Sequence, residues 1–165
     1  MLLQNKTAVV TGCNRGIGKK ILEVFSSNGA MIFACVRDVD DKFISYIDDL
    51  TKKFNNEIVP IQFDLNNESQ IKEAANTILS SEKSIDILIN NAATIHTAMF
   101  QMTSVKKLKE IFETNFFAQT VFTQYILKSM IKKKNGSILY ISSSSALDGN
   151  EGRSAYSSTK AAIIA

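Results

Sequence analysis

The feature that most limits how this chain can fold is a series of short, wholly apolar runs separated by longer segments of helical periodicity. The runs predict buried strands at residues 7–11, 31–36, 58–63, 86–90 and 137–142. Strands without polar alternation are buried on both faces, which is typical of a parallel sheet covered by helices. The sequence therefore predicts an α/β fold with a Rossmann-type, doubly wound parallel sheet.

Between these runs, apolar residues recur three or four positions apart, as on the buried face of a helix. The first helix is expected from Ile17 to Asn28, and its buried face is expected to hold Ile17, Ile21, Val24 and Phe25. Further helices are predicted near residues 43–54 and 71–79, from Ser104 to about Lys134, and from Ser154 onward. The run Lys132–Lys134, followed by Asn135-Gly136, is interpreted as a helix C-terminus rather than a phosphate-binding patch.

Composition narrows the class of protein. A length of 165 residues predicts one domain, residues 1–165. The formal net charge of +3 is too small to indicate a nucleic-acid partner, and no apolar stretch approaches the ~18 residues of a membrane span. The two cysteines, Cys13 and Cys35, are expected to be reduced thiols, and no cluster has metal-ligand spacing. We expect a cytoplasmic protein without a membrane or metal requirement.

The loop after the first strand is rich in glycine and precedes a helix. Glycines at such a turn let the backbone approach a pyrophosphate, while the helix N-terminus points its N–H groups and positive dipole at the negative charge. The spacing Gly-x-x-x-Gly-x-Gly differs from the general dinucleotide fingerprint Gly-x-Gly-x-x-Gly. The candidate cofactor-binding residues of this loop are Gly12, Asn14, Arg15, Gly16, Ile17 and Gly18.

A tyrosine and a lysine stand four residues apart near the end of the chain. Tyr156 and Lys160 would share one face of a helix, so that the lysine ammonium favours the tyrosine phenolate and makes the pair a candidate proton donor or base. Tyr-x-x-x-Lys also arises often by chance on ordinary surface helices. Ser143 lies thirteen residues before Tyr156, at the end of the fifth strand, where ligands of open parallel sheets bind.

Taken together, these motifs resemble the classical short-chain dehydrogenase/reductase family. The resemblance covers essentially the whole chain, because the loop is followed in order by matching residues after the third strand, after the fourth strand, in the long helix and near the C-terminus: Asp64-Leu65, Asn90-Asn91-Ala92-Ala93, Asn115, Ser143 and Tyr156-Ser157-Ser158-Thr159-Lys160. The flanking segments Gly136-Ser137-Ile138 and Gly149-Asn150-Glu151-Gly152 are similar to the 3-oxoacyl-acyl-carrier-protein reductase branch.

The resemblance implies an oxidoreductase that moves a hydride between a nicotinamide dinucleotide and a small-molecule carbonyl or alcohol, with a 3-oxoacyl thioester as the substrate that the reductase branch suggests. It implies that Tyr156 donates the proton, Lys160 assists and binds the nicotinamide ribose, Ser143 holds the carbonyl, and Asn115 anchors a water linked to the lysine. From the residues alone, Asn115 could equally be a helix break bonded to backbone. Further cofactor contacts are implied for Asp64, Leu65, Asn91, Ala92, Tyr156 and Lys160.

The residue that closes the second strand is expected to select the dinucleotide. Val36 fills the family's acidic position and Arg37 follows, so a 2′-phosphate and hence NADP(H) is favoured, with Arg15 in reach of the same phosphate. Asp38 lies twenty residues past Gly18, the general spacing of an NAD-binding acid, so NAD(H) stays open; the same acid could simply favour the next helix N-terminus. The single histidine, His96, is either a solvated loop residue or a substrate contact.

The sequence departs from the family in two places. Ala93 replaces the usual glycine of its motif, and family members continue past the Tyr-x-x-x-Lys helix into further strands and a substrate-covering segment. We therefore expect an incomplete domain without the C-terminal strands, and a fifth strand with an exposed apolar edge. The family's homo-oligomer is in doubt for this chain. The alternative functions are a truncated, catalytically inactive dinucleotide-binding fragment or an interaction protein.

Overall fold

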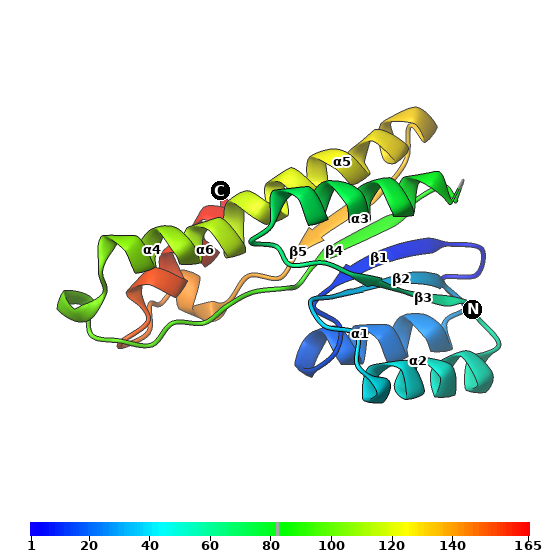
Figure 1. Cartoon of the computed structure of the whole chain (residues 1–165), viewed down its shortest axis with the longest axis horizontal. Coiled ribbons are helices and arrows are strands. Elements are labelled where there is room, and N and C mark those ends of the chain that lie inside the picture. The colour runs from blue at the N-terminus through cyan, green and yellow to red at the C-terminus, as the bar shows by residue number, and fades with distance from the viewer. Residues whose placement is uncertain (82) are drawn as a thin grey trace.

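A computed structural model of the chain, which describes residues 1–81 and 83–165, is built on one parallel sheet. The strand order is β3-β2-β1-β4-β5, so the chain moves outward from β1 to one edge and then returns to build the other half (Figure 1). The strands are β1 (Thr7–Thr11), β2 (Met31–Val36), β3 (Ile58–Gln62), β4 (Ile87–Asn90) and β5 (Ser137–Tyr140). The predicted fold class is confirmed.

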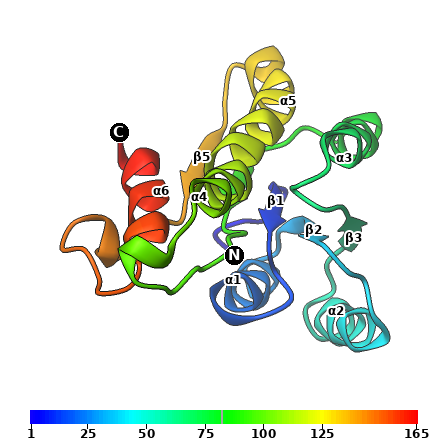
Figure 2. The same ribbon diagram turned by 60° about the vertical axis from the view of Figure 1, so that its left-hand side comes forward.

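Helices cover both faces of the sheet (Figures 1 and 2). On one face lie α1 (Gly16–Ser27) and α2 (Asp41–Phe54). The other face carries α3 (Glu68–Ser80) and a long helical region made of α4 (Val105–Phe112), the π-turn η2 (Glu113–Phe117) and α5 (Ala118–Lys133). The last helix, α6 (Ser154–Ile164), lies beside α4, and the short 3-10 helices η1 (Phe100–Met102) and η3 (Ser144–Ala146) complete the fold.

The two faces of the sheet build two separate apolar cores. Because side chains alternate along a strand, Val9 of β1 and Phe33 of β2 point toward α3 and α5, whereas Val10 and Ile32 point toward α1 and α2. These residues are at most 2% exposed. The double burial explains why the strands are apolar at every position, which was the basis of the sheet prediction.

The expected buried face of α1 is wrong in part. Ile17 is 61% exposed and Val24 is 43% exposed, whereas the buried positions are Gly18, Leu22 and Ser26. Gly18 faces the β1–α1 turn, where an added Cβ would come within 2.2 Å of the Gly12 carbonyl oxygen. This close contact holds Gly18 against the loop and leaves Ile17, the preceding residue, facing solvent.

The predicted ends of the long helical region are confirmed. The Ser104 hydroxyl caps α4 by accepting the Lys107 amide at 3.1 Å. At the other end, Lys134 adopts a left-handed conformation (φ 57°) and Asn135 donates its amide to the Met130 carbonyl at 3.2 Å. The lysine run therefore closes α5, as its interpretation as a helix C-terminus required.

β5 forms one edge of the described sheet, and Leu139 on it is 47% exposed. None of the helices in the described residues is both long and apolar enough to cross a membrane.

A buried carboxylate ties the amino ends of three strands together. Asp86 is 9% exposed. Its Oδ2 accepts a hydrogen bond from the Thr7 amide at 2.9 Å. Its Oδ1 accepts hydrogen bonds from Lys6 Nζ at 3.3 Å and from Lys133 Nζ at the end of α5. Its main chain also bonds to Thr7 and to Ser137 at the start of β5. Burial alone raises the pKa of this carboxyl, but the hydrogen bonds from Lys133, the Thr7 amide and Lys6 outweigh burial and lower the pKa below 3.8.

We predict that Asp86→Asn lowers the free energy of unfolding by about 1–3 kcal/mol at neutral pH, because the amide loses the charge-assisted bonds to two lysines. Since the folded-state pKa of Asp86 is depressed, its contribution is present above the unfolded pKa and is lost as pH falls through the folded pKa. Urea titrations from neutral pH to about pH 3 should show a shallower acid loss in D86N. The exposed Asp48→Asn is the control. If D86N is as stable as the unaltered protein, or if D48N loses as much stability as D86N, this role of Asp86 is contradicted.

Candidate functional site

The carboxyl ends of β1 and β4 are bound to each other by one threonine and one asparagine. The Thr11 hydroxyl accepts the amides of Asn91 and Ala92 at 3.0 and 3.1 Å. The Asn91 side-chain amide donates to the carbonyls of Thr11 and Gly12 at 3.0 and 2.9 Å. Asn91, a predicted cofactor contact, thus holds the glycine loop in place with its own side chain.

The glycines of this loop serve different purposes. Gly12 has φ +67°, and a Cβ on it would lie 2.7 Å from Ala92 Cα, so the loop can approach β4 only without a side chain there. Gly18 packs against the Gly12 carbonyl in the same way. Gly16, in contrast, has φ +54° and nothing within 4 Å of the position of a Cβ. Open space therefore lies in front of the first turn of α1.

The N-terminus of α1 has the features of an anion-binding site. No side chain caps the N-terminus of α1, and Asn14, Arg15 and Ile17 are all exposed around it. The first N–H groups of a helix attract an anion, and Arg15 adds a positive charge at the same end. The predicted loop residues are therefore brought together at the edge of the sheet where parallel α/β proteins bind ligands.

At the end of β2, Val36 is buried and the chain then reaches the surface with Arg37. Arg37 Nε lies 3.1 Å from Asp38 Oδ2, with both side chains more than 70% exposed. The bond and charge of Asp38 raise the pKa of the guanidinium, with a smaller contribution from Asp64. Asp38 does not cap the next helix; Asp40 does so by accepting the Phe43 amide at 2.8 Å.

After β3, the Asp64 carboxylate forms a local turn by accepting the Asn66 amide at 2.8 Å. The Asn66 side chain in turn accepts the Thr114 hydroxyl of η2 at 2.6 Å. Leu65 is half-buried against the core under α3 and α5. The structure therefore places Asp64 and Leu65 at the carboxyl edge, connected to the same π-turn that holds Asn115.

On α6, the predicted tyrosine and lysine lie side by side. Lys160 Nζ is 5.9 Å from the centroid of the Tyr156 ring, and the Lys160 side chain is almost fully buried. Burial lowers the pKa of the Lys160 amine. The ammonium donates to the Ile141 carbonyl at 2.6 Å, and the Ser142 hydroxyl donates to the Lys160 carbonyl at 2.8 Å. These bonds fasten α6 to the segment that follows β5.

Ser143 lies in that segment and caps the 3-10 helix η3. Its Oγ accepts the Ser145 amide at 3.2 Å and lies 2.8 Å from Ser145 Oγ. If Ser145 donates in both contacts, the Ser143 proton is left for a further acceptor. Ser145 is buried, and its contact with Ser143 is a feature that the spacing between Ser143 and Tyr156 does not predict.

Asn115 is buried in η2 and joins α6 to the chain after β4. Its Oδ1 accepts the Thr94 amide at 2.8 Å, and its Nδ2 donates to the Thr94 carbonyl at 2.9 Å and to Thr159 Oγ1 at 3.1 Å. The Thr159 hydroxyl in turn donates a hydrogen bond to the Tyr156 carbonyl at 2.7 Å. The Asn115 side chain is thus bonded to backbone within an irregular helical turn. This agrees with the interpretation of Asn115 as a helix break bonded to backbone.

The remaining candidates lie near these residues or apart from them. Ala93 is exposed beside Ala92, and His96 is half-buried with its Nε2 3.4 Å from Thr103 Oγ1. Both cysteines are free and buried, and burial raises the pKa of the Cys13 thiol to about 12. Within the described part of the chain, no three His, Cys, Asp or Glu side chains are placed to hold a metal ion.

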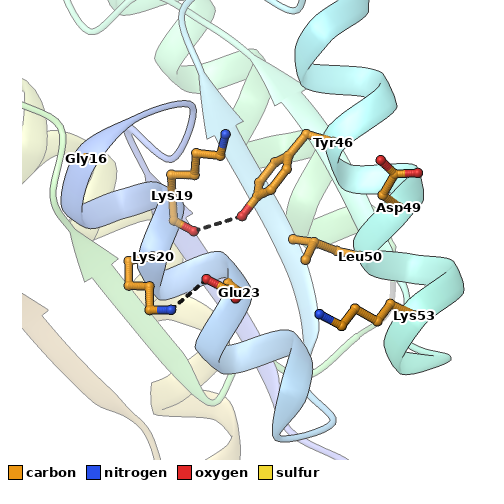
Figure 3. Close-up of a pocket in the computed structure, with 8 residues that line it drawn as sticks. All are labelled: Gly16, Lys19, Lys20, Glu23, Tyr46, Asp49, Leu50 and Lys53. Atoms are coloured by element: carbon orange, nitrogen blue, oxygen red, sulfur yellow. Dashed lines mark hydrogen bonds and ion pairs between the residues drawn. The ribbon is translucent and has the colours of Figure 1, made fainter.

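A surface hollow of about 510 Å³ lies elsewhere, between α1 and α2, and reaches the glycine loop only at Gly16 (Figure 3). Three of its lining charges contact other lining residues: Lys20 binds Glu23 at 2.7 Å, and Lys19 Nζ lies 4.1 Å from the centroid of the Tyr46 ring. No predicted catalytic residue lines it. We therefore locate the candidate site by its side chains, at the carboxyl edge of the sheet, rather than by this hollow.

Comparison with known proteins gives a consistent result. A model of the short chain dehydrogenase family matches residues 6–165. The chain is 33% identical to dehydrogenase/reductase SDR family member 7B of Danio rerio and 32% identical to the 3-oxoacyl-acyl-carrier-protein reductase FabG of Aquifex aeolicus, over 99% and 98% of its own length. The predicted similarity to the short-chain family and to this reductase branch is confirmed.

Among solved structures, the L-sorbose reductase of Gluconobacter frateurii, complexed with NADPH and L-sorbose, superimposes with a TM-score of 0.92 at 26% identity and covers 99% of the chain. The chain spans 54% and 65% of the two relatives named above and 63% of this reductase.

The contrast between the two glycines on α1 can be tested by stability. We predict that Gly18→Ala lowers the free energy of unfolding by about 3 kcal/mol, because its Cβ meets backbone that cannot move without opening the loop. Gly16→Ala has open space and should lose only about 1 kcal/mol, from the left-handed backbone. Urea unfolding followed by circular dichroism measures both; equal losses would contradict the assigned packing.

Proposed function

The chain belongs to the short chain dehydrogenase family, and we propose that it is an oxidoreductase that transfers a hydride between NADP(H) and a carbonyl or alcohol substrate. The observation that carries the proposal is the position of Tyr156 and Lys160. Their helix is fastened by Asn115 and Thr159 to the turn of residues 91–94, and the glycine loop is bound to the other side of that turn. We propose residues 1–165 as the dinucleotide-binding domain of this activity.

The dinucleotide, when bound, supplies or accepts the hydride, and the protein aligns and polarises the reactants. Tyr156 donates its hydroxyl proton to the substrate oxygen, and the Lys160 ammonium beside the ring favours the resulting phenolate. Ser143 donates a hydrogen bond to the same oxygen, because Ser145 can satisfy the Ser143 lone pairs.

Asn115 contributes through position. Both functional atoms of its amide already bind protein groups, so its side chain fixes α6 against Thr94. Gly16 and Arg15 would hold the pyrophosphate of the cofactor, and Asp64, Leu65 and Ala92 would line its nucleoside part.

Arg37 supports NADP(H) over NAD(H). It is an exposed guanidinium at the end of β2, and the acid that hydrogen-bonds a ribose 2′-hydroxyl in NAD-binding proteins is replaced there by buried Val36. The L-sorbose reductase similar to this chain is complexed with NADPH. For the substrate we propose a 3-oxoacyl thioester as the class to test first, because of the similarity to 3-oxoacyl-acyl-carrier-protein reductases.

Fluorescence titration of NADPH and of NADH into the purified protein tests the cofactor. We predict that Arg37→Ala weakens NADPH binding about tenfold or more and leaves NADH binding nearly unchanged, because a charge-assisted bond to the 2′-phosphate is lost. Asp38→Asn should strengthen NADPH binding about two- to fivefold, since Asp38 competes for Arg37 and repels the phosphate. Binding of neither dinucleotide contradicts the proposal and favours an interaction protein; equal effects of R37A on both contradict the NADP preference.

Turnover tests the catalytic residues. With 3-oxoacyl thioesters, sugars and simple ketones as substrates, NADPH oxidation should be slowed about 10²–10⁴-fold by Tyr156→Phe, because the proton donor is removed. Ser158→Ala is the matched control, since Ser158 is exposed on the same helix and bonds only to the Ser154 carbonyl. NADPH binding without turnover of any substrate favours a dinucleotide-binding protein that is not catalytic.

A further inference from the structure

Gln119, which the sequence analysis did not single out, contacts the turn after β4. It lies in the first turn of α5, is fully buried, and donates from Nε2 to the Ala92 carbonyl. Asn115, four residues earlier, binds both main-chain groups of Thr94. Two amide side chains from one helical stretch therefore hold the same short turn from the side opposite the glycine loop.

The other polar atom of the Gln119 amide has no hydrogen-bond partner among the described residues. Gln119 Oε1 is buried and accepts no hydrogen bond from any described group, and the same holds for Oδ1 of Asn90. The two oxygens belong to one layer between β4 and α5, because Asn90 Nδ2 donates at 2.8 Å to the hydroxyl of Thr123, one helical turn beyond Gln119. A buried acceptor without a donor is destabilising by about 1–3 kcal/mol.

The glutamine therefore leaves one buried acceptor unpartnered while its nitrogen binds the Ala92 carbonyl. An apolar side chain of the same length would avoid the unpartnered oxygen. What it would lose is the bond to Ala92. Since the Ala92 carbonyl can only accept, the glutamine must present its nitrogen there and leave its oxygen without a donor.

We propose that Gln119 is a positioning residue for the dinucleotide site. By holding the Ala92 carbonyl it fixes the peptide plane between Ala92 and Ala93, and so the direction of the chain between Asn91, which grips the glycine loop, and Thr94, which Asn115 holds. This role rests on the proposed function, because Ala92 is one of the residues assigned to the cofactor.

The turn contains its own reporters. The amides of Asn91 and Ala92 donate to Thr11 Oγ1, and the amide of Thr94 donates to Asn115 Oδ1. Each bond protects its proton from exchange with solvent as long as the turn stays closed. If Gln119 holds the turn, removing its amide increases the opening of these three bonds in the protein without any cofactor.

The experiment is amide hydrogen exchange by NMR on Gln119→Met, with Ile126→Val as the matched control. Ile126 is buried on the same helix and has no bond to the turn, so I126V reports the effect of general destabilisation. We expect exchange of the three amides to rise about fivefold or more in Q119M, and to stay near that of the unaltered protein in I126V. If Q119M does not fold, Gln119→Asn replaces it, because the shorter asparagine keeps an amide that does not reach Ala92. The exchange rates of the same three amides should rise in Q119N.

Unchanged exchange in Q119M or Q119N, or an equal rise in I126V, overturns the proposal. Dinucleotide titration supplies the second readout: Q119M should weaken NADPH and NADH binding by the same factor, about fivefold, because the turn is common to both cofactors. Increased exchange with unaltered binding also overturns the positioning role. If the unaltered protein binds neither dinucleotide, the proposed function is contradicted instead. This outcome can be told apart from the other, because the exchange experiment is done without a cofactor.

Discussion

The hydrogen bonds around residues 91–94 connect the two halves of the candidate site. On one side the turn is bound to Thr11 and Gly12 of the glycine loop, and on the other side Asn115 and Gln119 hold it from the long helical region. Asn115 continues through Thr159 to the main chain of Tyr156. A loop suited to a pyrophosphate and a helix suited to proton transfer, about 140 residues apart in sequence, thereby keep a fixed relation.

The same region carries an unusual share of buried polar groups. Lys160, Asn115, Gln119 and Thr159 are all at most 2% exposed, and each is bonded to main chain or to another of them. Such groups destabilise a core when they lack partners and make it specific when they have them. Two of these residues lie on α6 and two in the helical stretch packed against it, so this polar cluster adjoins the candidate site.

Much of this arrangement could be predicted from the sequence. Strand positions followed from runs that are apolar at every residue, and the positions of Tyr156, Lys160 and the glycine loop followed from motif spacing. The buried face of α1 was predicted wrongly in part because periodicity cannot register the contact between Gly18 and Gly12, which leaves Ile17 facing solvent. Local residue patterns did not predict the hydrogen bonds by which the Asn91 side chain holds the glycine loop, or the bond between Asn115 and Thr159. These bonds join segments that are distant in sequence. The contact between Ser143 and Ser145 was not predicted either.

The most direct test of the account is a crystal structure of the protein grown with NADP⁺. The account predicts that the pyrophosphate lies in front of Gly16 at the N-terminus of α1, that the 2′-phosphate contacts Arg37, and that the nicotinamide end points toward Tyr156 and Lys160. A dinucleotide bound instead in the hollow between α1 and α2, or one whose nicotinamide points away from α6, would contradict the assignment of the carboxyl edge as the active site.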